Sequence, residues 1–315
     1  METKNTPHLP FLSIIVPVYN GAQTVEKCVE SLLAQDYPKD RLEIIFVDNQ
    51  SKDRTLQVLQ PYAASGKILL LSETNVLNAY GARNTGIRAA KGDILAFTDS
   101  DCEAEPDWIR ELMVSFCNPL TGCVAGEIVP AKASNVFEKY GGEGFLSQRK
   151  GVGLAFPPVK GGNCGFLKHV LVKIGFFRED YPSGGDTELA WRMVQQTKMN
   201  IEVNLHAIVK HHNVSSLPVF FRQYMRYGTH IYLFTKLPSG LSQSRPSFLK
   251  VLINTVTYFM VFIKRVLLVC FHRTPSSISK LDQDIYLMGP VLRVLTEWAV
   301  WWGYRFAVKN PSLLR

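Results

Sequence analysis

The chain has 315 residues, of which 46% are hydrophobic and 20% charged, so it is neither a disordered chain nor an ordinary polytopic membrane protein. Six scattered cysteines form no CxxC pair, which argues against a structural zinc site and a disulfide framework and favours a reducing compartment. The first ten residues, METKNTPHLP, lack a basic stretch followed by an apolar one, so we expect no signal peptide.

Net charge is +8, but it is unevenly distributed along the chain. From His206 onward there are 14 Lys and Arg against 3 Asp and Glu, a net +11, whereas the preceding residues have a net charge of −3. An anionic membrane surface is a candidate partner for the basic C-terminal part.

Strand and helix patterns alternate four times over the first hundred residues. Strands are predicted from Leu12 to a stop at Pro17 and over 41–47, 67–71 and 94–97; helices are predicted over 25–35, from Ser51 or Asp53 through 59, and over 79–90. This alternation predicts an α/β fold with a mostly parallel sheet and helices on both faces. Such sheets bind ligands at the carboxyl ends of their strands, where Tyr19, Asn20, Asp48 and the 99–101 segment fall.

The segment Asp99-Ser100-Asp101 ends the fourth of these strands abruptly. Mg²⁺ takes oxygen ligands, typically one or two carboxylates together with substrate phosphates. The two aspartates therefore indicate a metal site that holds a diphosphate. In isolation the same pattern also fits a solvated turn, so the convergence of polar residues on one sheet edge carries the interpretation.

Four segments in order, VPVYN at 16–20, VDNQSKDRT at 47–55, GARNTGIRAAKGDIL at 81–95 and DSD at 99–101, resemble the successive signatures of family 2 glycosyltransferases. The resemblance runs from Leu12 to about Gly228. It implies the GT-A fold, in which a Rossmann-like nucleotide-binding half is joined to an acceptor-binding half. It also implies transfer of a sugar, with inversion, from a nucleotide-diphosphate donor with Mg²⁺ or Mn²⁺.

The resemblance assigns roles to the residues that match the family's motifs. Pro17 and Tyr19 would wall the nucleotide base, and Asp48 would hydrogen-bond it. Arg83 would lie beside the nucleotide and its phosphates. Asp99 would lie near the ribose as the first aspartate of the metal motif, and Asp101 would ligate the metal directly. Gly21 stands where the family often has Glu, and Asn49-Gln50 interrupt its acidic second motif, which leaves the nucleotide open.

Further along, the patterns predict a helix over 108–116, an antiparallel strand over 122–129 and an acceptor-side loop and helix over 137–158. The segment 161–166, GGNCGF, resembles the small-residue stretch beneath the donor sugar in this family, so Gly162 and Asn163 are candidate substrate-binding residues. Glycines there let the backbone approach a ligand closely, although an ordinary turn has the same composition.

The stretch Gly184 to Arg192 resembles the family segment that supplies the catalytic base, with Asp186 in the base position and Gly185 replacing a usual Glu. Transfer with inversion needs a carboxylate that accepts the proton of the acceptor hydroxyl. The simpler interpretation is that Asp186 caps a helix and that Glu188 pairs with Arg192 four residues later. One side chain can fill both roles.

A final strand is predicted over 201–209, leading to two histidines of which His212 is a candidate ligand of the metal or the diphosphate. Polar surface is the alternative. The basic aromatic helix predicted over 220–230 carries Arg222 and Arg226 four apart, a spacing suited to phosphate or anionic lipid.

The C-terminal segments 248–272 and 285–308 are strongly apolar with a polar line on one side, the pattern of amphipathic helices that lie in a membrane interface. Only 13 residues separate Lys250 from Lys264, which is short for a membrane span, and a transmembrane hairpin would bury Lys264 and Arg265. Packing on the catalytic domain or on a second subunit is the alternative.

The sequence therefore predicts a metal-dependent glycosyltransferase domain over 1–230 and a membrane-associated helical region over 231–315, at the cytoplasmic face of the membrane. Its donor would be a nucleotide-sugar and its acceptor a glycan or lipid-linked molecule, with no nucleic acid partner; a homo-oligomer stays open. A nucleotidyltransferase is disfavoured because VPVYNGAQT lacks a basic phosphate loop. A scaffold with a non-catalytic transferase domain is disfavoured by the intact Asp99, Asp101 and Asp186.

Overall fold

The structure, a computed structural model, describes residues 9–142, 147–149, 152, 156–181, 183–213, 216–235, 245–270 and 279–310. Most of the segment used for the signal-peptide prediction, 1–8, and part of the predicted 137–158 acceptor-side segment lie outside these residues. The chain forms two compact units. The sheet unit comprises 1–129, 146–179 and 185–211, and the helical unit comprises 130–145, 180–184 and 212–315.

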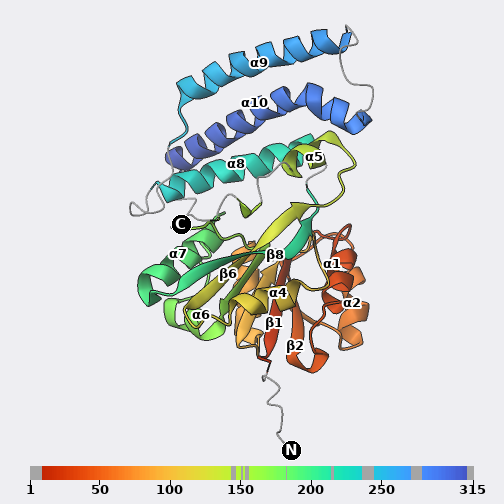
Figure 1. Cartoon of the computed structure of the whole chain (residues 1–315), viewed down its shortest axis with the longest axis vertical. Helices are drawn as coiled ribbons and strands as arrows, with labels where there is room; N and C mark the ends of the chain where they lie inside the picture. Colours follow the sequence, from red (N-terminus) through yellow and green to blue (C-terminus); the bar gives the residue numbers. More distant parts are fainter. Residues whose placement is uncertain are drawn as a thin grey trace, which may run out of the picture. The chain divides into compact units, whose positions relative to one another are not determined.

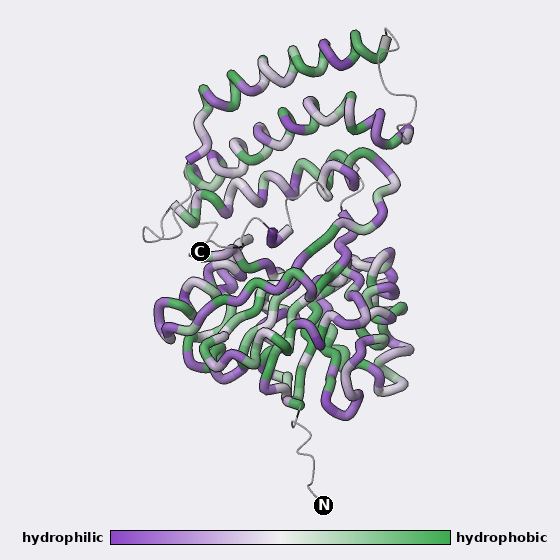
Figure 2. Tube along the Cα trace, in the orientation of Figure 1, coloured by the Kyte–Doolittle hydropathy of each residue, from purple (hydrophilic) through white to green (hydrophobic). Residues whose placement is uncertain are grey.

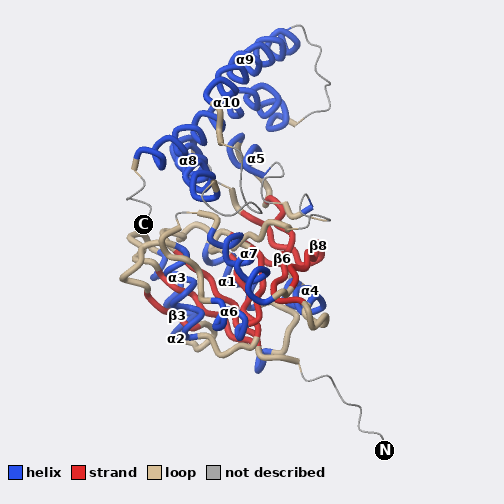
Figure 3. The backbone as a smooth tube through the Cα atoms, turned by 90° about the vertical axis from the view of Figure 1, so that its left-hand side faces the viewer, coloured by secondary structure: helices blue, strands red, loops and turns tan. Residues whose placement is uncertain are grey.

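The sheet unit is built on an eight-stranded sheet with the order β3-β2-β1-β4-β7-β6-β8-β5 (Figures 1 and 3). The strands are β1 Leu12–Val18, β2 Leu42–Asp48, β3 Leu69–Ser72, β4 Ile94–Thr98, β5 Cys102–Ala104, β6 Thr121–Pro130, β7 Asn163–Leu167 and β8 Asn200–His211. The predicted parallel arrangement is confirmed for the first four strands, because β2 pairs parallel with β1 and β3, and β1 with β4. Every residue of β1 and of β4 is buried, which explains their continuous apolar runs.

The other half of the sheet is antiparallel. Strand β7 pairs antiparallel with β4 and β6, and β5 pairs antiparallel with β8. The predicted antiparallel strand at 122–129 is therefore confirmed as β6. The segment 161–166 begins as a turn at Gly161 and Gly162 and continues as the central strand β7, in which Cys164 and Phe166 are fully buried. Small residues in a buried strand leave little periodic signal in the sequence.

Helices cover both faces of the sheet, as predicted. They are α1 Val25–Leu33, α2 Thr55–Ala64, α3 Ala79–Ala89, α4 Trp108–Ser115, α6 Lys168–Ile174 and α7 Gly185–Thr197, with a short 3-10 helix over Lys39–Arg41. On one face, Val25 and Cys28 of α1 join the core with Ile14 of β1. On the other face, α3 approaches β1 so closely that a Cβ on Gly86 would lie 2.5 Å from Ile15 Cγ2.

The helical unit contains α5 Val136–Gly142, α8 Leu217–Phe234, α9 Phe248–Cys270 and α10 Lys280–Lys309. Helix α10 lies between α8 and α9 (Figure 1). A small apolar core of Phe220, Tyr224, Leu292 and Ala299 joins α8 to α10. Helix α8 thus belongs to the helical unit, whose last segment begins at His212, and the predicted division at position 230 stays a prediction.

Candidate active site

The loops that follow β1, β2 and β4 meet at the carboxyl edge of the sheet. Asn49 N donates to Val18 O at 2.8 Å, and Asn20 N donates to Ser51 Oγ at 2.9 Å. A Cβ built on Gly21 would lie 3.3 Å from Ser100 Oγ. The sequence pattern therefore predicted correctly that these three polar segments share one edge.

Two of the predicted nucleotide-binding residues stand at the end of β1. Pro17 is paired with Val47 of β2 and lies beyond Ile15, where the pairing with β4 ends, so its missing N–H disrupts no ladder with β4. Tyr19 follows with an exposed ring, available to a ligand. Contact of either side chain with a nucleotide base stays a prediction.

Asp48 ends β2 with a buried carboxylate. Both of its oxygens accept from Ser51 N, at 3.3 and 3.2 Å. The carboxylate is therefore fixed at the strand end by its own turn, and its predicted bond to a base would use the remaining acceptor capacity.

Arg83 of α3 forms an ion pair with Asp99 at the end of β4. The guanidinium is almost fully buried and lies 5.7 Å from the ring centroids of both Tyr80 and Phe177. Burial opposes its charge, but the nearby carboxylates of Asp99 and Asp186 raise the pKa of Arg83. Its Nε has no hydrogen-bond partner in the described part of the chain. The motif aspartate and the motif arginine thus form one unit.

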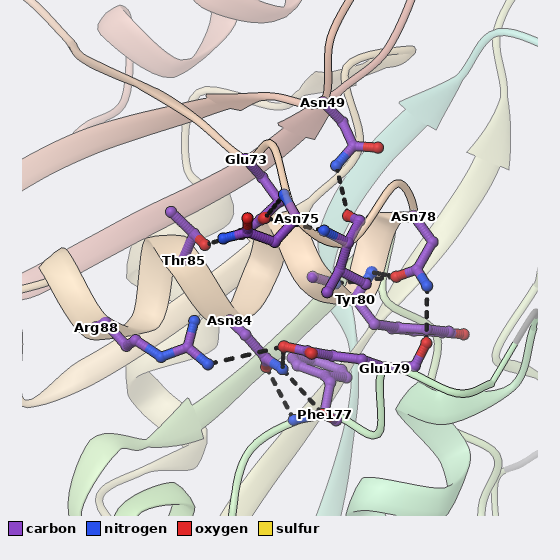
Figure 4. A network of polar contacts seen from close by, with 12 residues as sticks. Asn49, Glu73, Asn75, Asn78, Tyr80, Asn84, Thr85, Arg88, Phe177 and Glu179 are labelled. Atoms are coloured by element: carbon purple, nitrogen blue, oxygen red, sulfur yellow. Dashed lines mark hydrogen bonds and ion pairs between the residues drawn. The ribbon is translucent and has the colours of Figure 1, made fainter. Parts of the chain in front are cut away.

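Figure 4 shows the polar contacts that hold α3 in this position. Asn78 begins the helix, since its Oδ1 accepts from Tyr80 N and Gly81 N, each at 2.9 Å. Asn84 exchanges two hydrogen bonds with the backbone of Phe177, at 2.9 and 3.0 Å, and also donates to Glu179. These bonds fix the Phe177 ring beside Arg83.

The loop before α3 is held by Glu73, also drawn in Figure 4. Its carboxylate accepts from Asn75 N at 2.6 Å, from Val76 N at 3.0 Å and from the Thr85 hydroxyl. The hydrogen bond from Thr85, followed by the backbone bonds, lowers the pKa of Glu73 although burial works in the opposite direction. A charged Glu73 therefore ties the loop to the helix.

Two glycines connect the Arg83–Asp99 pair to Asp186. Gly161 N donates to Asp186 Oδ2 at 2.6 Å. A Cβ on Gly161 would lie 2.7 Å from Arg83 Nη2, and one on Gly162 would lie 3.1 Å from Asp99 Oδ2. The absence of side chains here brings the backbone against the charged groups of the protein itself. Contact of Gly162 with a donor sugar stays a prediction.

Asp186 lies in the first turn of α7, which begins one residue earlier than the predicted cap. Its Oδ1 accepts from Thr187 N at 3.0 Å. Tyr80 Oη accepts from Gly185 N at 2.8 Å, which fixes the start of the helix. Burial, with the Asp186 carboxylate nearby, raises the pKa of Tyr80, so its hydroxyl is neutral.

The predicted pair between Glu188 and Arg192 is confirmed as a two-bond contact, at 3.0 and 2.9 Å. Arg192 also donates to the carbonyls of Ile174 and Phe176, at 2.7 and 2.8 Å. This pair therefore fastens α7 to the segment that follows α6.

Asn163, which the sequence suggested as a substrate-binding residue, forms hydrogen bonds inside the protein. Its side chain is fully buried at the start of β7. Its Oδ1 accepts from Trp108 Nε1 at 2.8 Å, and its Nδ2 donates to Glu127 O and Ala207 O, both at 2.8 Å. Both amide hydrogens are used inside the protein, so Asn163 holds strands β7, β6 and β8 together.

One group of side chains in the described part of the chain has the spacing of a metal site: Asp101, Cys102 and His211, whose ligand atoms lie within 4.8 Å of one another. His211 Nε2 lies 3.5 Å from Asp101 Oδ2, and the Asp101 side chain is 42% exposed. Burial and the charge of Asp101 raise the pKa of the Cys102 thiol, so it stays protonated. A carboxylate and an imidazole could ligate Mn²⁺ or Mg²⁺, and substrate phosphate oxygens would complete the coordination.

This group includes neither Asp99 nor His212, so their predicted ligation of a metal stays a prediction. Asp99 is paired with Arg83 and is not part of the group, because the ion pair draws its carboxylate toward α3. His211, at the end of β8, faces Asp101. Strand alternation contained the signal, since His211 shares a face with the buried Val209 and Ala207.

Tyr80 and Phe177 are neighbours of Arg83 that the sequence patterns did not identify. Tyr80 lies three residues before Arg83, so the two side chains share one face of the helix, and this spacing could have identified Tyr80 from the sequence. Hydrogen bonds with Asn84 hold Phe177 beside Arg83, and no local sequence pattern predicts this contact.

The comparisons with known proteins agree with this geometry. Residues 13–174 match the family described as Glycosyl transferase family 2. The match covers more than half of the chain, and the chain belongs to this family of enzymes.

Among curated relatives, Glycosyltransferase AglE from Haloferax volcanii is 32% identical over 185 residues, which cover 58% of this chain and 60% of that protein. Among solved structures, the mannosyltransferase PcManGT from Pyrobaculum calidifontis, in complex with GDP-Man and Mn²⁺, is similar with a TM-score of 0.58 at 18% identity, covering 97% of this chain and 76% of that one. S. aureus TarS in complex with UDP-GlcNAc has a TM-score of 0.52 at 16% identity, covering 96% and 91%. At these identities the two structures establish the shared GT-A fold.

Proposed function

We propose that the chain transfers a sugar, with inversion, from a nucleotide-diphosphate-sugar donor to a hydroxyl of a lipid-linked or cell-surface glycan. Membership of the family supports glycosyl transfer, and two proteins of the same fold bind GDP-Man with Mn²⁺ and UDP-GlcNAc. The observation that carries the proposal is the junction at Gly161 and Gly162. There the Arg83–Asp99 pair, beside the predicted donor edge, is connected through backbone to the Asp186 carboxylate.

On the donor side, exposed Tyr19 and the fixed Asp48 carboxylate would receive the base. The Asp99 carboxylate, half-exposed beside Arg83, would receive the ribose. Asp101 and His211 would hold a divalent ion, which neutralises the charge that develops on the leaving diphosphate.

On the acceptor side, Asp186 is the proposed base. Gly161 N and Thr187 N donate to its carboxylate at the start of α7, which fixes the position of the two oxygens. The acceptor oxygen forms a bond to the anomeric carbon while the bond from that carbon to the diphosphate oxygen breaks. The hydroxyl proton passes to Asp186, and the nucleoside diphosphate leaves with the electron pair of the broken bond. One displacement of this kind inverts the anomeric centre.

A lipid-linked acceptor would be met at the cytoplasmic face of a membrane. The net +11 of the chain from His206 onward supports this location, because the cytoplasmic leaflet carries anionic lipids. Arg222 and Arg226, both exposed on α8, are the proposed contacts for phosphate or anionic lipid.

The test is a donor panel on the detergent-solubilised full chain. Binding and slow hydrolysis of UDP-, GDP-, dTDP- and CDP-sugars are measured with Mn²⁺ and with EDTA. We expect one preferred donor that requires the metal. Protein that is folded by circular dichroism but binds no donor would contradict the proposal and favour a scaffold. A donor that is hydrolysed equally well in EDTA would contradict the proposed metal dependence.

A further inference from the structure

Helix α9 directs polar side chains toward α10 within the helical unit. Asn254 Nδ2 donates to both carboxylate oxygens of Glu297, at 3.0 and 2.8 Å. Thr255 Oγ1 accepts from Trp298 Nε1 at 2.9 Å. The side of α9 that faces the protein is therefore held by hydrogen bonds as well as by apolar contacts.

The opposite side of α9 is apolar and exposed. Its exposed side chains recur at helical spacing: Leu249, Leu252, Ile253, Val256, Phe259, Met260, Ile263 and Leu267. We call these eight residues the outer stripe. The stretch Phe248–Val269 has a mean hydropathy of 1.7 with only 6% of its most apolar window buried, and Figure 2 shows the apolar colour recurring along α9. Thr257 interrupts this side, but its hydroxyl donates to Ile253 O at 3.0 Å within the helix.

A backbone carbonyl in α10 that lacks its helical partner holds Arg265 away from the outer stripe. Pro290 has no N–H, so the carbonyl of Tyr286, four residues earlier, loses its helical partner. Arg265 Nη1 donates to this carbonyl at 2.7 Å, and its guanidinium lies 4.6 Å from the Tyr286 ring centroid. The charge that would count against lipid contact is thus used to complete a neighbouring helix.

We propose that the outer stripe of α9 lies in the hydrocarbon boundary of an anionic bilayer leaflet, with the helix along the membrane surface. A helix in water buries its apolar side and exposes its polar side, and α9 does the reverse. Lys250 and Lys264 lie within the length of the stripe, which runs from Leu249 to Leu267, and both are exposed. The intervening residues span about 20 Å at 1.5 Å per residue, less than the ~30 Å of a bilayer core.

Charge distinguishes a lipid surface from a second copy of the chain as the occupant. Two stripes that paired with each other would bring lysines of one copy toward lysines of the other, where like charges repel. Lipid phosphates attract the same two ammonium groups, whose long stems allow them to reach the headgroups. This inference deepens the proposed function by naming the surface on which a lipid-linked acceptor would be met, but it requires no sugar chemistry.

The test compares two double variants of the full chain. Val256→Glu with Met260→Glu places two charges in the outer stripe, at side chains 60% and 63% exposed. Val172→Glu with Val114→Glu places two charges on the sheet unit, at side chains 63% and 59% exposed. Flotation is measured with phosphatidylcholine vesicles containing 30% phosphatidylserine and with phosphatidylcholine alone. Circular dichroism and sedimentation in detergent-free buffer report the fold and the oligomeric state.

We expect the wild type and the sheet-unit variant to float with anionic vesicles and the stripe variant to float about tenfold less or worse. Neutral vesicles should recover less of the wild type. A folded stripe variant that floats like the wild type, or a wild type that does not float, would overturn the proposal. A wild-type dimer that the stripe variant converts to monomer, with unchanged flotation, would overturn it in favour of a second copy. None of these results depends on donor turnover, so they leave the proposed glycosyl transfer untouched.

Discussion

Strand β4 and helix α9 are both apolar segments, yet they present opposite surfaces. All five residues of β4 are buried, and its polar residues follow at the strand end, where Asp99 and Asp101 stand. Helix α9 exposes its apolar outer stripe and directs Asn254 and Arg265 toward α10. Apolar periodicity therefore reports which side chains share a face, whereas the surroundings decide whether that face lies inside. In our proposal the surroundings of α9 are lipid.

Disrupting the contact between α8 and α10 should have the largest effect on this comparison, because it destabilises the helical unit and leaves the sheet unit intact. A Cβ on Gly228 would lie 2.0 Å from Val300 O, and one on Gly303 would lie 1.9 Å from Met225 O. We expect Gly228→Val to separate the helices at a cost of about 3 kcal/mol or more, because backbone atoms leave no room for repacking.

Urea unfolding followed by far-ultraviolet circular dichroism measures this loss. Gly289→Ala, also in α10, is the matched control, since its nearest neighbour is a flexible Arg265 Nη1 at 3.6 Å. We expect that control to be neutral or slightly stabilising. Equal unfolding midpoints for Gly228→Val and wild type would show that the two helices do not pack through these glycines.

A smaller loss of unfolding free energy is expected when Arg265 is replaced. Arg265→Ala leaves the Tyr286 carbonyl without a partner, which costs about 1–3 kcal/mol. Pro290→Ala supplies the missing N–H, so the same arginine change should cost less in that background. A double-mutant cycle of unfolding free energies measures the difference. Equal costs in both backgrounds would show that Arg265 does not serve the proline defect.

The smallest expected effect lies in the sheet unit and depends on pH. The folded state holds the pKa of Glu73 below its ordinary value, so the unfolded state binds more protons in acid. The stability that Glu73 contributes is therefore present above about pH 4.3 and lost as pH falls through the lower folded pKa. Glu73→Gln should flatten the decline of thermal midpoint between about pH 5 and pH 3. An unchanged slope would assign the acid sensitivity elsewhere.

Local patterns predicted the part of the fold that depends on neighbours in sequence. Alternating strands and helices defined the parallel half of the sheet and the edge shared by Tyr19, Asp48 and the 99–101 segment. Pairing between strands that are distant in sequence could not be predicted from such local patterns. Asn163 became a buried connection because β7 enters between β4 and β6. His211 reached Asp101 because β8 pairs with β5.

The C-terminal helices show a different limit. Their periodicity predicted a polar line on one side of each helix, but not that Asn254 and Arg265 would both bond to α10. The direction of the line depends on Glu297 and on the carbonyl freed by Pro290, each more than 20 residues away in sequence. Membrane contact itself stays a proposal.

The central claim is that donor binding at the sheet edge and proton acceptance by Asp186 are separate functions of two groups that Gly161 connects. Asp186→Asn tests this claim most directly. The amide keeps an oxygen that can accept from Gly161 N but cannot take a proton as a base. Metal-dependent binding of the preferred donor and its transfer to an acceptor are measured in wild type, Asp186→Asn and Asp101→Ala. We predict that Asp186→Asn binds the donor normally and transfers it about 10²–10⁴-fold more slowly, whereas Asp101→Ala loses the metal-dependent binding. Undiminished transfer by Asp186→Asn would contradict the account.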